Sequence, residues 1–259
     1  MGTERELLSS VRNAARLLKQ FTTHDRELGV SELARRLDVG KSTVHRLLST
    51  LAGEGFLEQD AESGKYRLGL VVYDLGAAVA VHMDLHEAVL PPMERLRNAT
   101  GETVHTAVLD GREVVYVERL DSPNTLRLFL DVGRRNWAHC TGTGKALLAF
   151  LPEPQLDRLL KGWRLPQKTP HTITDVQLLR KELKETHRRG YAQNMNESEM
   201  GVLSVAAPIR DGSGRVRAAV SVAGPAPRMD PIMDQFIAGV LEAAASASRR
   251  LGFRGSMRP

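Results

Sequence analysis

The feature that most constrains this chain is the stretch Gly29–Leu68, in which two short amphipathic helices flank a tight turn. Ser31 can cap a first helix that runs to Leu37, and residues 38–40 supply the turn. A second helix is predicted over residues 41–52. Its apolar side chains recur at the spacing of one buried stripe: Val44, Leu47, Leu48 and Leu51. The pattern predicts a helix-turn-helix whose second helix enters a DNA major groove.

The plain alternative is a helical hairpin that only packs, and the next segment argues against it. Residues 56–59 and 65–68 are predicted as two strands joined by a polar turn. Tyr66 and Leu68 are expected to face inward, which leaves two cations outward on a winged helix-turn-helix of residues 1–69. The residues expected at the DNA are Ser31, Lys41, Ser42, Thr43, His45, Arg46, Lys65 and Arg67.

Length and charge set limits on these expectations. The 259 residues are enough for two modest domains, and the formal net charge is +5. Acidic and basic side chains nearly balance in the first 69 residues. DNA affinity is therefore expected to depend on a few placed Lys and Arg side chains, because the domain has no broad positive field.

Cysteine usage and apolar runs indicate the compartment. The single cysteine, Cys140, excludes an internal disulfide framework and is typical of a reducing cytosol. The N-terminus has no signal-peptide pattern. The longest apolar run, from Leu70 to Val81, contains Asp74 and is too short to span a bilayer. We expect a soluble cytoplasmic protein with no membrane partner.

A linker helix is predicted over residues 70–90, behind a first helix at residues 6–21. From Leu70 to Met83 it is apolar on nearly all sides, so it must be buried against another helix. Its natural partner is the same helix of a second subunit, and the alternative is burial within its own chain. Pro91-Pro92 is expected to end this helical run, and a short helix follows from Met93 to Thr100.

Residues 91–251 change to a mixed pattern of strands and helices. Antiparallel strands with helices at the start, middle and end predict an α+β fold. The predicted strands are residues 102–109, 113–119, 126–130, 204–209 and 216–223. The predicted helices are residues 142–151, a helix capped by Thr174 that ends at Gly190, and residues 231–251. Residues 252–259 are expected to form a disordered tail.

Three motifs that could bind a nucleotide or a metal, or catalyse a reaction, are incomplete in this sequence. Two Gly-Lys pairs lack the upstream Gly of a phosphate loop, because Arg35 and His139 occupy that place. His139-Cys140 could offer a thiol nucleophile with His105 as a base, but a lone cysteine is more often a small buried apolar residue. The same three residues lack zinc-ligand spacing. We expect no enzyme, no metal and no cofactor.

Two polar groups suggest a ligand pocket. Gly142-Thr143-Gly144 enters a predicted helix, where its amides favour an anionic oxygen or simply form a capping turn. Ser204 and Ser221 lie in otherwise apolar strands, and Asn194 precedes them. A hydroxyl inside a sheet satisfies backbone or faces a cavity. Spacing leaves open whether these residues meet.

The whole chain resembles the isocitrate lyase regulator (IclR) family of bacterial transcription factors. The motifs are GVSELARRLDVGKSTVHRLLSTL, TGETVH, HCTGTGKALLAFLP, RGYAQN and GVLSVAAPIRD through VSVAGP, which cover about residues 5 to 250. The resemblance implies a winged helix-turn-helix, a dimerising linker helix and a GAF-like effector-binding domain. It further implies a dimer or dimer of dimers that binds operator DNA and responds to a small metabolite, with a lean towards a carboxylate.

The resemblance also implies which residues bind the effector. They are Leu128, Gly142, Thr143, Asn194, Val202, Ser204, Ser221 and Ala223. Many members of the family carry an acidic residue where this chain has Asn194, and some carry Cys where it has Ser204. Two other classes stay open: a GAF-like enzyme or sensor with a DNA-binding appendage, and a structural DNA binder without an effector.

Overall fold

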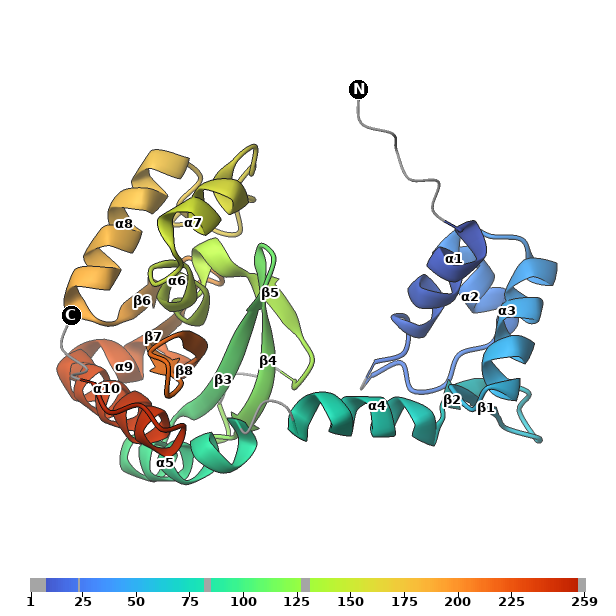
Figure 1. Ribbon diagram of the computed structural model, residues 1–259, viewed down its shortest axis with the longest axis horizontal. Coiled ribbons are helices and arrows are strands. Elements are labelled where there is room, and N and C mark those ends of the chain that lie inside the picture. Colours follow the sequence, from blue (N-terminus) through green and yellow to red (C-terminus); the bar gives the residue numbers. More distant parts are fainter. Residues whose placement is uncertain (1–7, 23, 82–84, 127–130, 256–259) are drawn as a thin grey trace. The chain divides into compact units, whose positions relative to one another are not determined.

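The computed structural model describes residues 8–22, 24–81, 85–126 and 131–255. The chain divides into two compact units, Met1–Met83 and Asp84–Pro259 (Figure 1). Within the described residues, no helix has the length and apolar character needed to cross a membrane.

The first unit is a winged helix-turn-helix followed by an apolar helix. Its elements are α1 (Ser9–Leu18), α2 (Val30–Leu37), α3 (Lys41–Gly53), β1 (Leu57–Gln59), β2 (Tyr66–Leu68) and α4 (Leu70–Val81). Leu17, Leu33 and Leu48 are fully buried in one small core with Val44 and Tyr66. The helical periodicity therefore predicted the inward face of α3 correctly.

Two details of this unit differ from the sequence prediction. Ser31 is not the cap of α2, because Gly29 holds that position without a side-chain hydrogen bond and Ser31 is exposed in the first turn. Leu68 does not face inward, since its side chain is 40% exposed. Tyr66 is held inward by two backbone hydrogen bonds with Leu28, of 2.9 and 3.0 Å. This bridge to Leu28 is isolated and does not include Leu68.

The second unit is built on a six-stranded antiparallel sheet with the order β5-β4-β3-β8-β7-β6. The strands are β3 (Thr103–Asp110), β4 (Glu113–Leu120), β5 (Arg135–Trp137), β6 (Ala192–Met195), β7 (Val202–Arg210) and β8 (Val216–Pro225). The helices are α5 (Leu85–Thr100), α6 (Gly142–Leu148), α7 (Glu153–Leu160), α8 (Val176–Arg189), α9 (Ala226–Met229) and α10 (Met233–Arg250), with 3-10 turns at Ala138–Cys140 and Asp230–Ile232.

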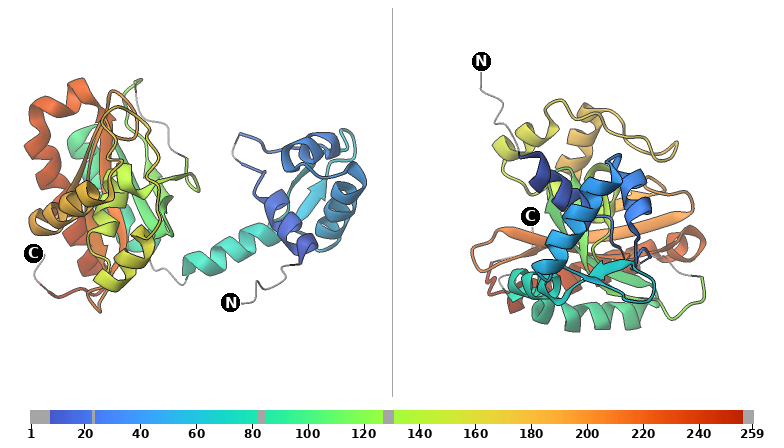
Figure 2. Two further views of the ribbon diagram at one scale, coloured as in Figure 1. Left: turned by 90° about the horizontal axis from the view of Figure 1, so that it is seen from above. Right: turned by 90° about the vertical axis from the view of Figure 1, so that its right-hand side faces the viewer.

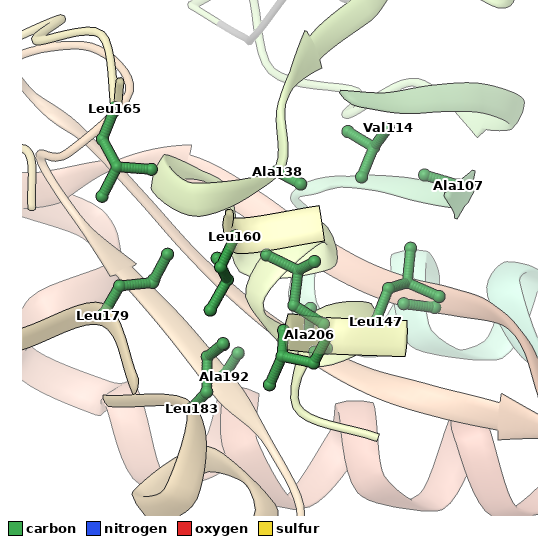
Figure 3. Close-up of a cluster of buried hydrophobic side chains, with 14 of the residues drawn as sticks. Ala107, Val114, Ala138, Leu147, Leu160, Leu165, Leu179, Leu183, Ala192 and Ala206 are labelled. Carbon is green, nitrogen blue, oxygen red and sulfur yellow. The ribbon is translucent and has the colours of Figure 1, made fainter. Parts of the chain in front are cut away.

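Helices cover both faces of this sheet (Figure 2). α5 and α10 pack together on one face, and α6 packs on the other with α8 against it. Figure 3 shows the apolar cluster beneath α6, α7 and α8, where Leu147, Leu160 and Leu183 meet Ala206 of β7. The predicted α+β class is confirmed, with every strand antiparallel to its neighbours.

The prediction that Pro91-Pro92 ends a helix is wrong, because α5 continues through both prolines. A proline inside a helix cannot donate to the carbonyl four residues earlier, which for Pro91 is that of Glu87. The Arg250 side chain on α10 donates to this carbonyl from Nε at 3.3 Å and from Nη2 at 3.1 Å. Tertiary hydrogen bonding thus replaces the missing helical bond.

Other boundaries also shift. Asp175, and not Thr174, caps α8, since its Oδ1 accepts from Gln177 N at 2.8 Å and Leu178 N at 2.9 Å. The helix predicted to Leu151 ends at Leu148, and Pro154 lies in the first turn of a further helix, where no N–H is needed. The strand predicted at residues 126–130 falls mostly outside the described residues. Strands β5 and β6 were not predicted.

The predicted disordered tail is described as far as residue 255. Phe253 N donates to Ser248 O at 2.9 Å, and the Arg210 guanidinium lies 6.0 Å from the Phe253 ring centroid. The first part of the tail therefore packs at the end of α10.

Candidate functional site

The exposed face of α3 carries the polar side chains predicted at the DNA. Val44 and Leu48 are fully buried, which fixes the opposite face outward. The residues of this exposed face are Lys41, Ser42, Thr43, His45 and Arg46. They occupy the first two turns of the helix, so a surface of donors and acceptors lies at its N-terminal end.

The wing offers less positive charge than its sequence suggests. Lys65 is exposed, as predicted. Arg67 lies opposite Glu58 in the β1–β2 ladder and donates to its Oε2 from Nε at 3.0 Å and from Nη2 at 2.9 Å. Both side chains are about half exposed, at 53% and 46%, so this ion pair is weak and can exchange for another anion.

A cavity of about 490 Å³ lies in the second unit, between the sheet and the start of α6. Seven of the eight residues assigned to the effector by resemblance line it: Gly142, Thr143, Asn194, Val202, Ser204, Ser221 and Ala223. Leu128, the eighth, lies outside the described residues. The structure therefore brings together residues that sequence spacing could not connect.

Strand register explains how these residues meet. Ser204 on β7 pairs with Asn194 on β6 and with Ala223 on β8, so the three form one row across the sheet. Ser221 on β8 pairs with His105 on β3 in the next part of the same sheet. Residues two apart on a strand share a face, which places Ser204 with Val202.

The loop that enters α6 closes the cavity against β7. Thr141 caps the helix, because its Oγ1 accepts from Gly144 N at 3.2 Å. A Cβ on Gly142 would lie 2.9 Å from Ser204 Oγ, and one on Gly144 would lie 2.2 Å from Ala138 O. Gly144 therefore needs glycine, because its backbone approaches that of Ala138 closely, and Gly142 leaves room for the Ser204 hydroxyl.

Two aromatic side chains form the floor on the β3–β4 side. His105 is buried, and its ring centroid lies 5.2 Å from that of Tyr116. Burial, with a smaller effect of Arg119, lowers the pKa of His105 to about 3, so the imidazole is neutral. Its Nε2 has no hydrogen-bond partner among the described atoms. Burial raises the pKa of the Tyr116 phenol, which stays protonated and able to donate.

Charged groups also line the cavity. Arg134 and Lys168 contribute cations, and Glu199 contributes a carboxylate. The sequence reasoning missed eight lining residues as cavity residues: His105, Tyr116, Arg134, Asn136, Thr141, Lys168, Ser198 and Glu199. His105 and Thr141 lie within the motifs TGETVH and HCTGTGKALLAFLP, and membership of those motifs was the available signal. Lys168 lies in an irregular segment, where periodicity gives none.

The amide of Asn194 is engaged by its own loop. Its Oδ1 accepts from Glu197 N at 2.7 Å and from Ser198 N at 3.4 Å, and its Nδ2 donates to Ser198 Oγ at 2.9 Å. This residue therefore lines the cavity and also fixes the connection between β6 and β7.

Cys140 and His139 do not form an activated thiol pair. Burial raises the pKa of Cys140 to about 12, so the thiolate is scarce at neutral pH. His139 Nε2 lies 3.0 Å from Pro166 O, and burial lowers the pKa of this histidine. Among the described residues, no cluster of three or more His, Cys, Asp or Glu side chains has an arrangement that could hold a metal ion.

Comparison with known protein families identifies the family of this chain. The family model "IclR helix-turn-helix domain" matches residues 10–61, and "Bacterial transcriptional regulator IclR C-terminal" matches residues 77–249. The chain belongs to the IclR family. This IclR-family chain is a DNA-binding transcriptional regulator, as the matched domains and the relatives below indicate.

Two named transcriptional regulators are similar to this chain over most of their length. HTH-type transcriptional regulator XynR of Escherichia coli K12 is 34% identical over 248 residues, covering 95% of this chain and 98% of that protein. KdgR of the same strain is 33% identical over 235 residues, covering 90% and 89%.

Solved structures of IclR proteins are also similar. An IclR homolog from Microbacterium hydrocarbonoxydans, complexed with 4-hydroxybenzoate, has a TM-score of 0.83 at 29% identity, covering 94% of this chain and 99% of that one. The Thermotoga maritima IclR has a TM-score of 0.75 at 28% identity, covering 94% and 99%.

Proposed function

We propose that this IclR-family regulator binds operator DNA through the exposed face of α3 and changes that binding when a small polar acid occupies the cavity. The observation that carries the proposal is the cavity itself, whose walls are dominated by hydrogen-bonding side chains from β3, β6, β7 and β8. A buried imidazole nitrogen without a partner, at His105, supports a ligand that supplies the missing hydrogen bond.

The lining favours a hydroxylated carboxylate over an apolar aromatic ligand. Arg134 and Lys168 are suited to a carboxylate, and Ser204 and Ser221 are suited to hydroxyl groups. Val202 and Ala223 supply a small apolar wall. The similar IclR homolog complexed with 4-hydroxybenzoate supports an acid as the effector class.

The effector test is a thermal-shift and calorimetric screen of the full chain against D-gluconate, pyruvate, glyoxylate and 4-hydroxybenzoate, with toluene as the uncharged aromatic comparison. We expect hydroxylated acids to bind more tightly than toluene, and Lys168→Met to weaken that binding about tenfold or more by removing a charge-assisted contact. Lys161→Met, at an exposed lysine that does not line the cavity, is the matched control. Tighter binding of toluene than of the acids would contradict a hydroxylated carboxylate as the effector class.

At the DNA, we assign base contacts to Ser42, Thr43, His45 and Arg46, and phosphate contacts to Ser31, Lys41, Lys65 and Arg67. Arg46 is exposed on the recognition helix, and a guanidinium is suited to a guanine edge. Arg46→Ala should weaken operator binding by about 1–3 kcal/mol and relax sequence preference. Lys65→Ala should instead weaken operator and random DNA alike. If Arg46→Ala weakened binding to operator and random DNA equally, Arg46 would contact only the DNA backbone.

The proposed regulator acts as a dimer or dimer of dimers, with α4 as the dimerising element. Leu70 and Tyr73 are each 74% exposed, and Leu75 is 54% exposed. Such apolar exposure on one short helix supports burial against a second copy. Paired heads would then contact half-sites about 34 Å apart. We further propose that the chain has no catalytic activity, which the high pKa of the lone thiol, Cys140, supports.

A further inference from the structure

The connection between β6 and β7, residues 196–201, forms one wall of the effector cavity. Ser198 and Glu199 line the cavity from this connection, here called the effector loop. Its bend is tight, because Asn196 has a left-handed φ of 64° and its Oδ1 accepts from Gly201 N at 2.7 Å. The position of the ligand wall therefore depends on what holds this short loop.

Glu197, the second residue of the effector loop, does not line the effector cavity. Its side chain lines a second, separate cavity of about 330 Å³ together with Lys145 and Glu182. Lys145 Nζ lies 2.6 Å from Glu197 Oε1 and 3.4 Å from Glu182 Oε1. Both side chains of the close pair are buried, Lys145 at 2% exposure and Glu197 at 8%.

The backbone of Glu197 is held as firmly as its side chain. Its N–H donates to Asn194 Oδ1 at 2.7 Å, and its carbonyl accepts from Thr172 Oγ1 at 2.6 Å and from Thr169 Oγ1 at 3.4 Å. One residue thus connects the end of β6, the connection before α8 and, through Lys145, helix α6. These segments lie far apart in the sequence.

We propose that Glu197 and Lys145 are positioning residues for effector recognition, whose buried ion pair holds Ser198 and Glu199 at the cavity wall. Lys145 does not line the effector cavity, although Gly142 and Thr143 of the same helix do. A buried ammonium and carboxylate are costly to desolvate, and removing one partner leaves the other uncompensated. Ligand affinity consequently depends on a charge pair that the ligand never touches.

The charged side chains of the second cavity are paired with one another. Arg189 Nη2 donates to Glu182 Oε1 at 2.9 Å, and Lys145 is shared between two carboxylates. The charged groups at this place therefore neutralise one another.

Hydrogen exchange of the full-length protein tests the proposal without any ligand. Lys145→Met removes the cation, and Lys145→Arg keeps it. Thr172→Val removes the hydroxyl that donates to the Glu197 carbonyl and accepts from Lys168 N and Thr169 N, without burying a lone charge. We expect amides of residues 195–202 to exchange about tenfold faster in Lys145→Met and Thr172→Val, with β7–β8 core amides unchanged and Lys145→Arg close to wild type. Lys181→Met, at an exposed lysine of α8, is the control.

The binding arm rests on the proposed function and uses D-gluconate and 4-hydroxybenzoate as probes. We expect the Kd of a bound probe to rise about tenfold in Lys145→Met and to recover in Lys145→Arg. If neither probe binds the wild-type protein, the proposed effector class is wrong. Hydrogen exchange of residues 195–202 still tests whether the ion pair positions the loop. Exchange at residues 195–202 that matches wild type in Lys145→Met, or that rises equally across the whole unit, would overturn the positioning role. Should Lys145→Met not fold, Glu197→Gln, in which Lys145 keeps Glu182 as a carboxylate partner, is judged by the same exchange of residues 195–202.

Discussion

Glu58 controls how much positive charge the wing can present to a phosphate. Its carboxylate holds Arg67 across the β1–β2 ladder in an exposed pair. Exposed pairs contribute little to stability, so their main effect here is on the local field. We expect DNA affinity of the first unit to depend on a few cations, and one of them, Arg67, is partly neutralised by Glu58.

Glu58→Gln should therefore strengthen DNA binding. Releasing Arg67 adds about one phosphate contact, which raises affinity several-fold at low salt and steepens the salt dependence by about one unit of log slope. Fluorescence anisotropy over a KCl series measures both. Glu62→Gln, in the exposed wing turn, makes the same charge change without this partner. An equal gain in the two variants would mean that only net charge matters.

His105 should make stability sensitive to acid. Its folded pKa of about 3 lies below the ordinary value of 6.5, so the unfolded chain binds the extra proton between these values. Stability is then fully present above pH 6.5 and is lost as pH falls, at up to about 1.4 kcal/mol per pH unit.

Urea unfolding from pH 7 to pH 4 checks this expectation. In His105→Gln the position no longer titrates, so the free energy of unfolding should fall less steeply than in wild type. His139, whose pKa is also lowered by burial, contributes to both proteins and cancels in the comparison. Parallel pH profiles for the two proteins would show that His105 is not buried as a neutral base.

At the scale of elements, periodicity predicted which faces are buried but not where elements stop. The apolar stripe of α3 and the β7–β8 hairpin follow from local pattern alone. α5 does not, because its passage through Pro91 depends on Arg250, which is 159 positions further along the chain. β6 was missed for a similar reason, since its four residues become a strand only beside β7.

Arg250→Met should cost about 1 kcal/mol of stability, because the Glu87 carbonyl then loses its donor. Chemical denaturation of the second unit measures the loss, with the exposed neighbour Arg249→Met as control. Pro91→Ala restores an N–H within the helix, so Arg250→Met should cost less in that background. Additive effects of the two substitutions would contradict the compensation.

For the whole molecule, the candidate cavity shows what one sequence can and cannot predict. Family resemblance named seven of its lining residues, and strand register then explains their convergence. The charged members, Arg134 and Lys168, come from segments without periodicity, so no local pattern marks them. The buried pair of Lys145 and Glu197 is equally hidden, because a lysine in a sequence is expected at the surface.

We expect function to require two copies, as proposed above, because a DNA-binding domain whose charges nearly balance should bind DNA weakly alone. Replacing the exposed Leu70 and Tyr73 of α4 together with Gln removes the apolar surface proposed to pair. Sedimentation should show a shift towards monomer, and operator affinity should fall about 100-fold or more as the second half-site contributes less. Effector binding should persist, since the cavity lies wholly in the second unit. An unchanged oligomer would place the subunit contact elsewhere.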